Sequence, residues 1–119
     1  RAPYVHPKQF LWIQPGHPEA EEKAEICNTQ AMNGYHEKNY LLCYEASTEA
    51  IRLNPNKLAY YGNRAAAALK VRGQQHLRQA IEDCRTACAL DPGYIKGYTR
   101  SAEAHFLMGE PHTVLLAIE

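Results

Sequence analysis

The chain has 119 residues, 45% of them apolar, which is enough for one domain with a buried core. Its 13 basic and 13 acidic residues cancel, so it lacks the broad positive field that non-specific nucleic-acid binding requires. The apolar runs, such as residues 65–69, are far shorter than the roughly 20 residues of a membrane-spanning helix. We therefore expect neither a nucleic-acid partner nor a membrane partner.

Residues 1–17 contain three prolines and a glycine without a sustained period, which predicts a leader or linker. The apolar cluster at residues 10–13 supports an alternative, in which this stretch docks on the rest of the domain or on a neighbouring chain. The chain opens at Arg1 and stops within an expected helix, so we expect it to be a piece of a longer protein.

The first expected helix covers about residues 18–33. Pro18 suits the first turn, where a missing N–H costs nothing, and the glutamates that follow suit the positive end of the helix dipole. Asn33 and Gly34 tolerate positive φ and predict the end of this helix. A second helix, with its apolar residues on one face, is expected over about residues 38–53.

Proline-containing breaks at residues 54–56 and 91–93 separate the remaining helices. We expect a helix over about residues 58–70, whose four consecutive alanines allow close helix packing, and another over about residues 75–89 after Gly73. A further helix is expected over about residues 95–108, followed by a turn at Gly109 and by the start of a last helix near Pro111.

The helix pairs repeat along the chain at a spacing of roughly 34 residues, and such units stack into a solenoid with a groove. Asn63 and Arg100 occupy equivalent positions, but their separation exceeds the usual period by three residues. We place these extra residues in the turn at 71–76, and a similar insertion at 33–36.

Several segments resemble tetratricopeptide-repeat domains of the co-chaperone type. The resemblance covers residues 18–119 and is carried by Asn-Arg-Ala-Ala-Ala at 63–67, Ala-Ile-Glu-Asp-Cys at 80–84, Leu-Asp-Pro at 90–92 and Tyr-Ile-Lys-Gly-Tyr-Thr-Arg at 94–100. Residues 60–66 also resemble tetratricopeptide proteins that carry a J domain. The resemblance implies an all-α, right-handed solenoid of about three helical hairpins. Its repeats would cover residues 18–57, 58–94 and 95–119, the last of them truncated.

Domains of this family often hold the C-terminus of a heat-shock chaperone, ending Glu-Glu-Val-Asp, through a two-carboxylate clamp. Lys96 and Arg100 are four residues apart and share one face of their helix, as Asn63 and Lys70 do at a spacing of seven. Asn63 stands at the place of the family's clamp asparagine, and Asn28 would supply a second amide. The resemblance thus implies that Asn28, Asn63, Lys70, Lys96 and Arg100 bind the peptide.

One family ligand is missing, because the lysine expected four residues before Asn28 is Ala24 here. Lys23 is next to it but points about 100° away around the helix. The residues also have purely structural interpretations: Lys96 and Arg100 as a solvated face, and Asn63 as a bridge within the solenoid.

Catalytic and cofactor motifs are missing from the sequence. It has no nucleophile elbow, no phosphate-binding glycine loop and no His-Glu-x-x-His helix, so we expect no enzyme and no cofactor. Cys84 and Cys88 could form half of a metal site, and the four cysteines could form two disulfides. We favour buried, reduced thiols that act as small apolar residues, with no metal, and hence a cytoplasmic location.

The leading hypothesis is an adaptor that binds the acidic C-terminal peptide of a heat-shock chaperone in its concave groove. The alternative is a scaffold that binds a folded partner within a larger assembly without a working clamp, using Phe10 and Trp12 as anchors.

Overall fold

The computed structural model describes residues 7–109. A short 3-10 helix, η1 (Pro7–Phe10), precedes five α-helices. These are α1 (Ala20–His36), α2 (Tyr40–Leu53), α3 (Leu58–Val71), α4 (Gln74–Leu90) and α5 (Ile95–Leu107). The described part of the chain contains no β-strand, so the prediction of an all-α helical-repeat fold is confirmed. No helix in residues 7–109 is both long enough and apolar enough to cross a membrane.

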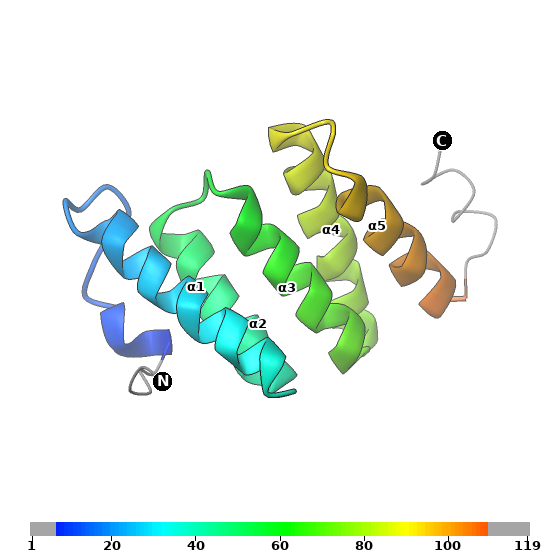
Figure 1. Cartoon of the computed structure of the whole chain (residues 1–119), viewed down its shortest axis with the longest axis horizontal. Helices are drawn as coiled ribbons and strands as arrows, with labels where there is room; N and C mark the ends of the chain where they lie inside the picture. The colour runs from blue at the N-terminus through cyan, green and yellow to red at the C-terminus, as the bar shows by residue number, and fades with distance from the viewer. Residues whose placement is uncertain (1–6, 110–119) are drawn as a thin grey trace.

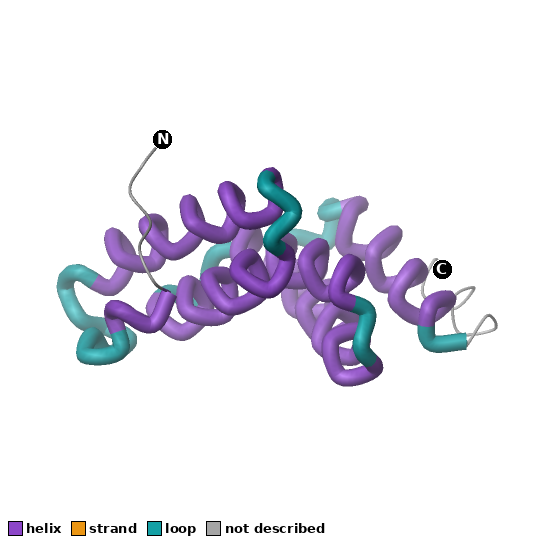
Figure 2. The backbone as a smooth tube through the Cα atoms, turned by 90° about the horizontal axis from the view of Figure 1, so that it is seen from below, coloured by secondary structure: helices purple, strands orange, loops and turns teal. Residues whose placement is uncertain are grey.

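The helices form two layers, with α1, α3 and α5 in front of α2 and α4 (Figure 1). Each pair of consecutive helices packs together, and contacts also join α1 to α3 and α3 to α5. Seen from a second direction, the layers form an arch rather than a flat slab (Figure 2). The front layer is therefore the surface to which successive hairpins contribute side by side.

Small side chains fill the contacts between the helices. All four alanines at residues 65–68 are buried, as predicted for a helix that its neighbours approach closely. Cys27, Cys43 and Cys84 each belong to a different buried apolar cluster. Burial raises the pKa of Cys27 and Cys84 to about 12 and that of Cys43 to about 11, so these thiols are neutral near pH 7. The prediction that they act as small apolar residues is confirmed.

The predicted end of the first helix is wrong. The helix α1 continues through Asn33 and Gly34 to His36, and Lys38 rather than the glycine takes positive φ, at 64°. A Cβ on Gly34 would lie 3.1 Å from the backbone nitrogen of Cys43. This glycine therefore serves the close approach of α1 to α2 rather than a turn.

The predicted insertion at residues 71–76 is also wrong. The helix α3 ends at Val71 and α4 begins at Gln74, so Arg72 and Gly73 alone join them, with Arg72 at φ 74°. The helices α1 and α4 have 17 residues each, against 14 in α2 and in α3. The first helix also begins later than predicted: α1 starts at Ala20, so Pro18 lies in the turn before it rather than in its first turn.

The apolar cluster of the leader docks on the first hairpin. Phe10 is 5% exposed, and Ile13 is fully buried among residues of α1, α2 and α3. The guanidinium of Arg52 on α2 donates to the backbone carbonyls of Phe10 and Ile13 at 2.9 and 2.8 Å. Docking on the domain therefore describes these two residues better than a linker does, whereas Trp12 is 64% exposed.

The last described helix ends close to its predicted boundary. The helix α5 ends at Leu107, and Gly109 follows with φ 79°, as expected for a turn at that glycine. The last helix expected from the sequence, near Pro111, falls outside the described residues.

Candidate functional site

An amide pair joins the first and second hairpins at the front layer. Asn63 on α3 donates from Nδ2 to Oδ1 of Asn28 on α1, over 2.7 Å. Asn28 is only 8% exposed. The bridging role considered for Asn63 is therefore present, and it places both predicted amides at one point between α1 and α3.

The helix α5 contacts α3 through Arg100. Its Nη1 donates to the backbone carbonyl of Gly62 on α3 at 3.2 Å and to the hydroxyl of Tyr94 at 3.0 Å. Gly62 directly precedes Asn63 in α3. Arg100 of α5 thus contacts α3 at the residue before Asn63, and Asn63 in turn bonds to Asn28 of α1.

The two predicted lysines are less closely joined to this group. Lys96 is exposed, lies one helical turn before Arg100, and forms no ion pair within residues 7–109. Lys70 is exposed near the C-terminal end of α3. Seven residues at 1.5 Å each place it about 10 Å along the helix from Asn63. Lys70 therefore lies at the far end of this face rather than beside the amide pair.

The family's missing lysine is not replaced by Lys23. The ammonium of Lys23 lies 3.7 Å from Glu19 and 5.4 Å from the ring centroid of Phe10, so it faces the docked leader. Ala24 is fully buried in the core cluster that contains Phe10. Neither position offers a cation beside Asn28.

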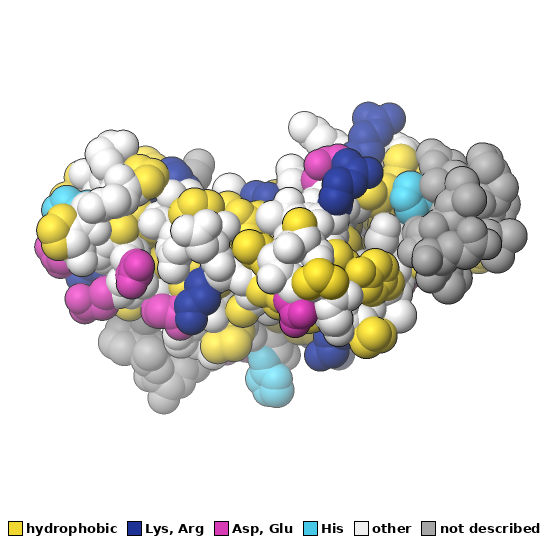
Figure 3. Space-filling view, turned by 90° about the horizontal axis from the view of Figure 1, so that it is seen from above, with side chains coloured by type: hydrophobic (Ala, Val, Ile, Leu, Met, Phe, Trp, Pro, Cys, Tyr) yellow, Lys and Arg dark blue, Asp and Glu magenta, His cyan; other side chains and the backbone are white. Residues whose placement is uncertain are grey.

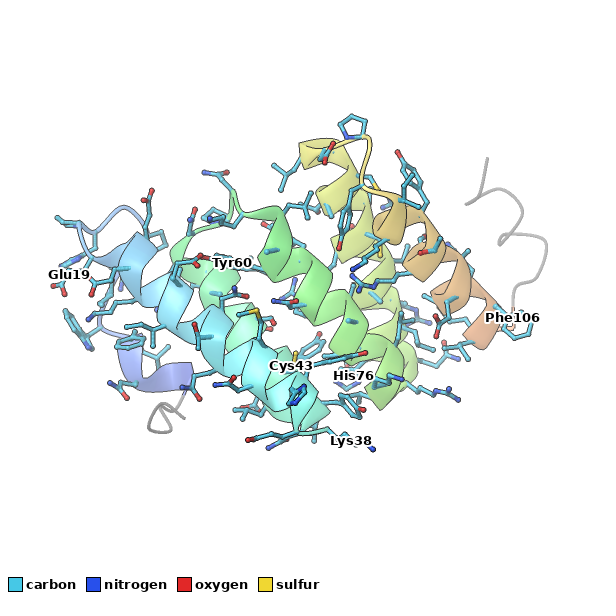
Figure 4. The ribbon with its side chains drawn as sticks, in the orientation of Figure 1. Glu19, Lys38, Cys43, Tyr60, His76 and Phe106 are labelled. Carbon is cyan, nitrogen blue, oxygen red and sulfur yellow. The ribbon has the colours of Figure 1, made fainter. Side chains whose placement is uncertain are left out.

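A carboxylate that the sequence reasoning missed lies near the amide pair. Glu25 is three residues before Asn28 on α1 and accepts a hydrogen bond from the hydroxyl of Tyr60, which lies between α1 and α3 (Figure 4). Burial raises the pKa of Tyr60, and the bond to Glu25 acts in the same direction. The ammonium of Lys57 is 3.9 Å from Glu25 and partly offsets its charge. The three-residue spacing from Asn28 was the available signal for Glu25.

Charge is unevenly distributed over the molecule. On the face shown in Figure 3, acidic side chains gather toward the α1 end. The first turn of α1 carries Glu21 and Glu22. Arg100 of α5 adds a positive charge on one side of the amide pair, and the α1 side carries Glu25, which is partly offset by Lys57. An anionic ligand would therefore be attracted more strongly by the α5 side of the site.

A metal centre finds no support in the part of the chain that the structure describes. No group of three or more His, Cys, Asp or Glu side chains converges there. Cys84 of the pair considered for metal binding is buried in an apolar cluster. The chemistry available around Asn28, Asn63 and Arg100 is instead hydrogen bonding to an anion.

The chain matches known proteins in its sequence. It is 35% identical over 99 residues to small glutamine-rich tetratricopeptide repeat-containing protein 2 of Saccharomyces cerevisiae, and this match spans 83% of the chain and 28% of that protein. It is 37% identical over 87 residues to the DnaJ homolog subfamily C member 7 homolog of Dictyostelium discoideum, spanning 72% of the chain and 16% of that protein. Human serine/threonine-protein phosphatase 5 is 36% identical over 91 residues, spanning 76% of the chain and 18% of the phosphatase, within its tetratricopeptide-repeat region. No protein-family model matches the chain.

Solved structures give the same result. The tetratricopeptide-repeat domain of Arabidopsis OM64 superimposes with a TM-score of 0.75 at 28% identity, covering 82% of this chain and 78% of that domain. The TPR2B domain of yeast Sti1, in its pHsp70 complex, gives a TM-score of 0.72 at 29% identity, covering 81% of this chain and 74% of that one. The chain spans less than a third of the sequence relatives named above. It belongs to the tetratricopeptide-repeat domains of the co-chaperone type.

Proposed function

We propose that this chain is an adaptor module that binds the acidic C-terminal peptide of a heat-shock chaperone, in the cytoplasm and without catalytic activity of its own. The observation that carries the proposal is that polar side chains of α1, α3 and α5 meet at α3: Arg100 donates to the carbonyl of Gly62, next to Asn63, which donates to Asn28. The Sti1 domain with a similar fold, in its pHsp70 complex, supports the choice of ligand.

The chemistry suits a terminal aspartate. Such a residue carries two carboxylates, one from the main chain and one from the side chain, and hydrogen bonds to ionised groups are about twice as strong as neutral ones. We expect Arg100 and Lys96 to bind these carboxylates, with Asn28 and Asn63 as amide donors and Lys70 as a contact farther along the peptide. Ala24 removes one cationic contact, which by the usual strength of such bonds weakens binding by about 1.5–3 kcal/mol.

A direct test compares a peptide ending Glu-Glu-Val-Asp as the free acid with the same peptide amidated at its terminus, by fluorescence anisotropy. We expect the free acid to bind more tightly, and Lys96→Ala or Arg100→Ala to weaken its binding by about tenfold or more, since tenfold corresponds to about 1.4 kcal/mol. Raising the salt concentration should weaken binding as well.

Arg85→Ala is the matched control. Arg85 is also cationic, with its side chain 70% exposed, but it lies on α4 in the other layer and pairs with Glu82. Its replacement should leave affinity unchanged. Equal binding of the free acid and the amide, or equal losses in Arg85→Ala and Arg100→Ala, would refute the proposal.

A scaffold that binds a folded partner without a clamp is the second candidate, and two exposed apolar residues of the leader favour it. Phe10 is not one of them, because it is buried in the chain's own core, contrary to the prediction from the sequence. Leu11 and Trp12 are 55% and 64% exposed, and Leu11 lines a shallow pocket with Tyr44 of α2. A partner on this surface would leave the amide pair untouched.

A further inference from the structure

The orientation of Arg100 depends on two residues to which the sequence assigned no role in the site. The Nη1 of Arg100 donates both of its hydrogens, one to the carbonyl of Gly62 and one to the hydroxyl of Tyr94. Tyr94 is the N-cap residue of α5, so its hydroxyl reaches Arg100 from the beginning of the same helix. The guanidinium is thereby fixed at two points, one on α3 and one at the beginning of its own helix.

Gly62 provides the space for this arrangement. It lies inside α3, where glycine lowers helix stability relative to alanine. A Cβ at this position would lie 2.5 Å from the hydroxyl oxygen of Tyr94 and 3.5 Å from Nη1 of Arg100. The tyrosine hydroxyl thus occupies the place where any other residue would carry its side chain.

In two other arginines of the chain, the edge of the guanidinium formed by Nε and Nη2 binds a carboxylate. Arg52 donates from Nε and Nη2 to both carboxylate oxygens of Glu49, at 2.8 and 2.5 Å. Arg64 donates from the same two atoms to both oxygens of Asp83, at 2.8 and 2.7 Å. In both, Nη1 donates elsewhere, to a backbone carbonyl or a hydroxyl, as it does in Arg100. Within residues 7–109, no acceptor takes the Nε and Nη2 hydrogens of Arg100.

We propose that Tyr94 is a positioning residue: seated over Gly62, it holds Arg100 so that the Nε and Nη2 edge receives a carboxylate of the bound peptide in a two-point bond. This inference rests on the proposed function and deepens it. A guanidinium that is already fixed loses less conformational freedom on binding than one that rotates freely. Tyr94 contributes to affinity in this way without touching the ligand.

The test is a double-mutant cycle with Tyr94→Phe and Arg100→Ala, measured with the peptide ending Glu-Glu-Val-Asp as the free acid. Removing the tyrosine hydroxyl should weaken binding about three- to tenfold, as expected for one hydrogen bond. In the Arg100→Ala background the same change should have no further effect. An equal loss in both backgrounds, or no loss at all, would overturn the positioning role.

Tyr98→Phe is the matched control for the tyrosine. Tyr98 is also on α5, but its hydroxyl donates to the carbonyl of Pro92 rather than contacting Arg100, and its replacement should not change affinity. Gly62→Ala should reproduce the loss seen with Tyr94→Phe, because the added methyl displaces the hydroxyl. A circular-dichroism melting curve of each variant separates this loss from unfolding.

A readout that needs no peptide separates this inference from the proposed function. Nitrogen-15 NMR of the free protein reports rotation about the Nε–Cζ bond of Arg100, which should be slow in the wild type and faster in Tyr94→Phe. Unchanged rotation would refute the positioning role even if the peptide binds. Slower rotation in the wild type without any peptide binding would support it and refute the proposed function alone.

Discussion

The ion pair of Arg64 and Asp83 is the most buried charged contact between α3 and α4. Their side chains are 13% and 2% exposed, and Asp83 also accepts a hydrogen bond from Gln79 at 3.0 Å. Arg64 in addition donates to Thr48 of α2 at 3.2 Å. This one side chain therefore links three helices.

Asp83→Asn should destabilise the domain strongly. Breaking a buried pair by neutralising one partner leaves the other charge without compensation, at a cost of about 3–5 kcal/mol. The free energy of unfolding in urea would measure the loss. Glu82→Gln is the control, because Glu82 and Arg85 are 61% and 70% exposed and such a surface pair contributes about 0–1 kcal/mol. Similar effects of the two variants would contradict the assignment of Arg64 and Asp83 as the structural pair.

At the scale of single residues, the sequence predicted the residues of the site better than their partners. The family resemblance identified Asn28, Asn63 and Arg100; in the structure Asn63 bonds to Asn28, and Arg100 bonds to Gly62, the residue before Asn63. The resemblance did not identify Tyr94, whose bond to Arg100 depends on side-chain orientation at the start of α5. It also did not identify the bond from Tyr60 of α3 to Glu25 of α1, although the spacing of Glu25 from Asn28 was a local signal. The use of these residues in peptide binding stays a prediction.

Among the structural elements, the docked leader makes the clearest energetic contribution. Ile13 is fully buried against the first hairpin, and its backbone carbonyl accepts a hydrogen bond from Arg52. Ile13→Ala should lower the free energy of unfolding by about 2–5 kcal/mol, as large-to-small changes in cores do. Urea unfolding followed by circular dichroism would measure it.

The neighbouring Trp12 is the control for this prediction. It is larger than Ile13 but 64% exposed, so Trp12→Ala should change stability little. A larger loss from Trp12→Ala than from Ile13→Ala would show that the leader packs differently. Deleting residues 1–16 would remove Ile13 too, so it tests stability as well as partner binding and cannot by itself distinguish an adaptor from a scaffold.

Helix existence was predictable at this scale and helix ends were less so. Each of the five helices was expected from periodicity and from proline breaks, but α1 passes through the Asn33-Gly34 signal. Gly34 lies where α1 meets the start of α2. A Cβ added there would be 3.1 Å from the backbone nitrogen of Cys43. A glycine selected for close packing and one selected for a turn look the same in a sequence.

For the whole molecule, the sequence repeat predicted the architecture because each helix pair must bury its apolar face against the neighbouring pair. Small residues such as Ala65 and Ala68 let neighbouring helices approach, and stacked hairpins then form a layer from alternate helices (Figure 1). The repeat is three residues longer than usual, and we predicted these residues in the turn at 71–76. That turn contains only Arg72 and Gly73, since extra residues can be accommodated in helices as well as in turns.

This layer gives the molecule a site that no single hairpin has. Asn28, Asn63 and Arg100 come from α1, α3 and α5, so the proposed site needs all three helices in place. The exposed surface of Leu11 and Trp12 is formed by the leader beside α2, in the other layer. The two candidate functions therefore use different faces of the molecule.

The most direct test is an NMR titration of the labelled protein with the peptide ending Glu-Glu-Val-Asp. We predict that the side-chain amide signals of Asn28 and Asn63 and the Nε signal of Arg100 shift with the free acid and not with the amidated peptide. The Nε signal of Arg85 on α4 should stay in place. Shifts confined to the Trp12 indole and to α2, or no shifts at all, would contradict the existence of an anion-binding site across α1, α3 and α5.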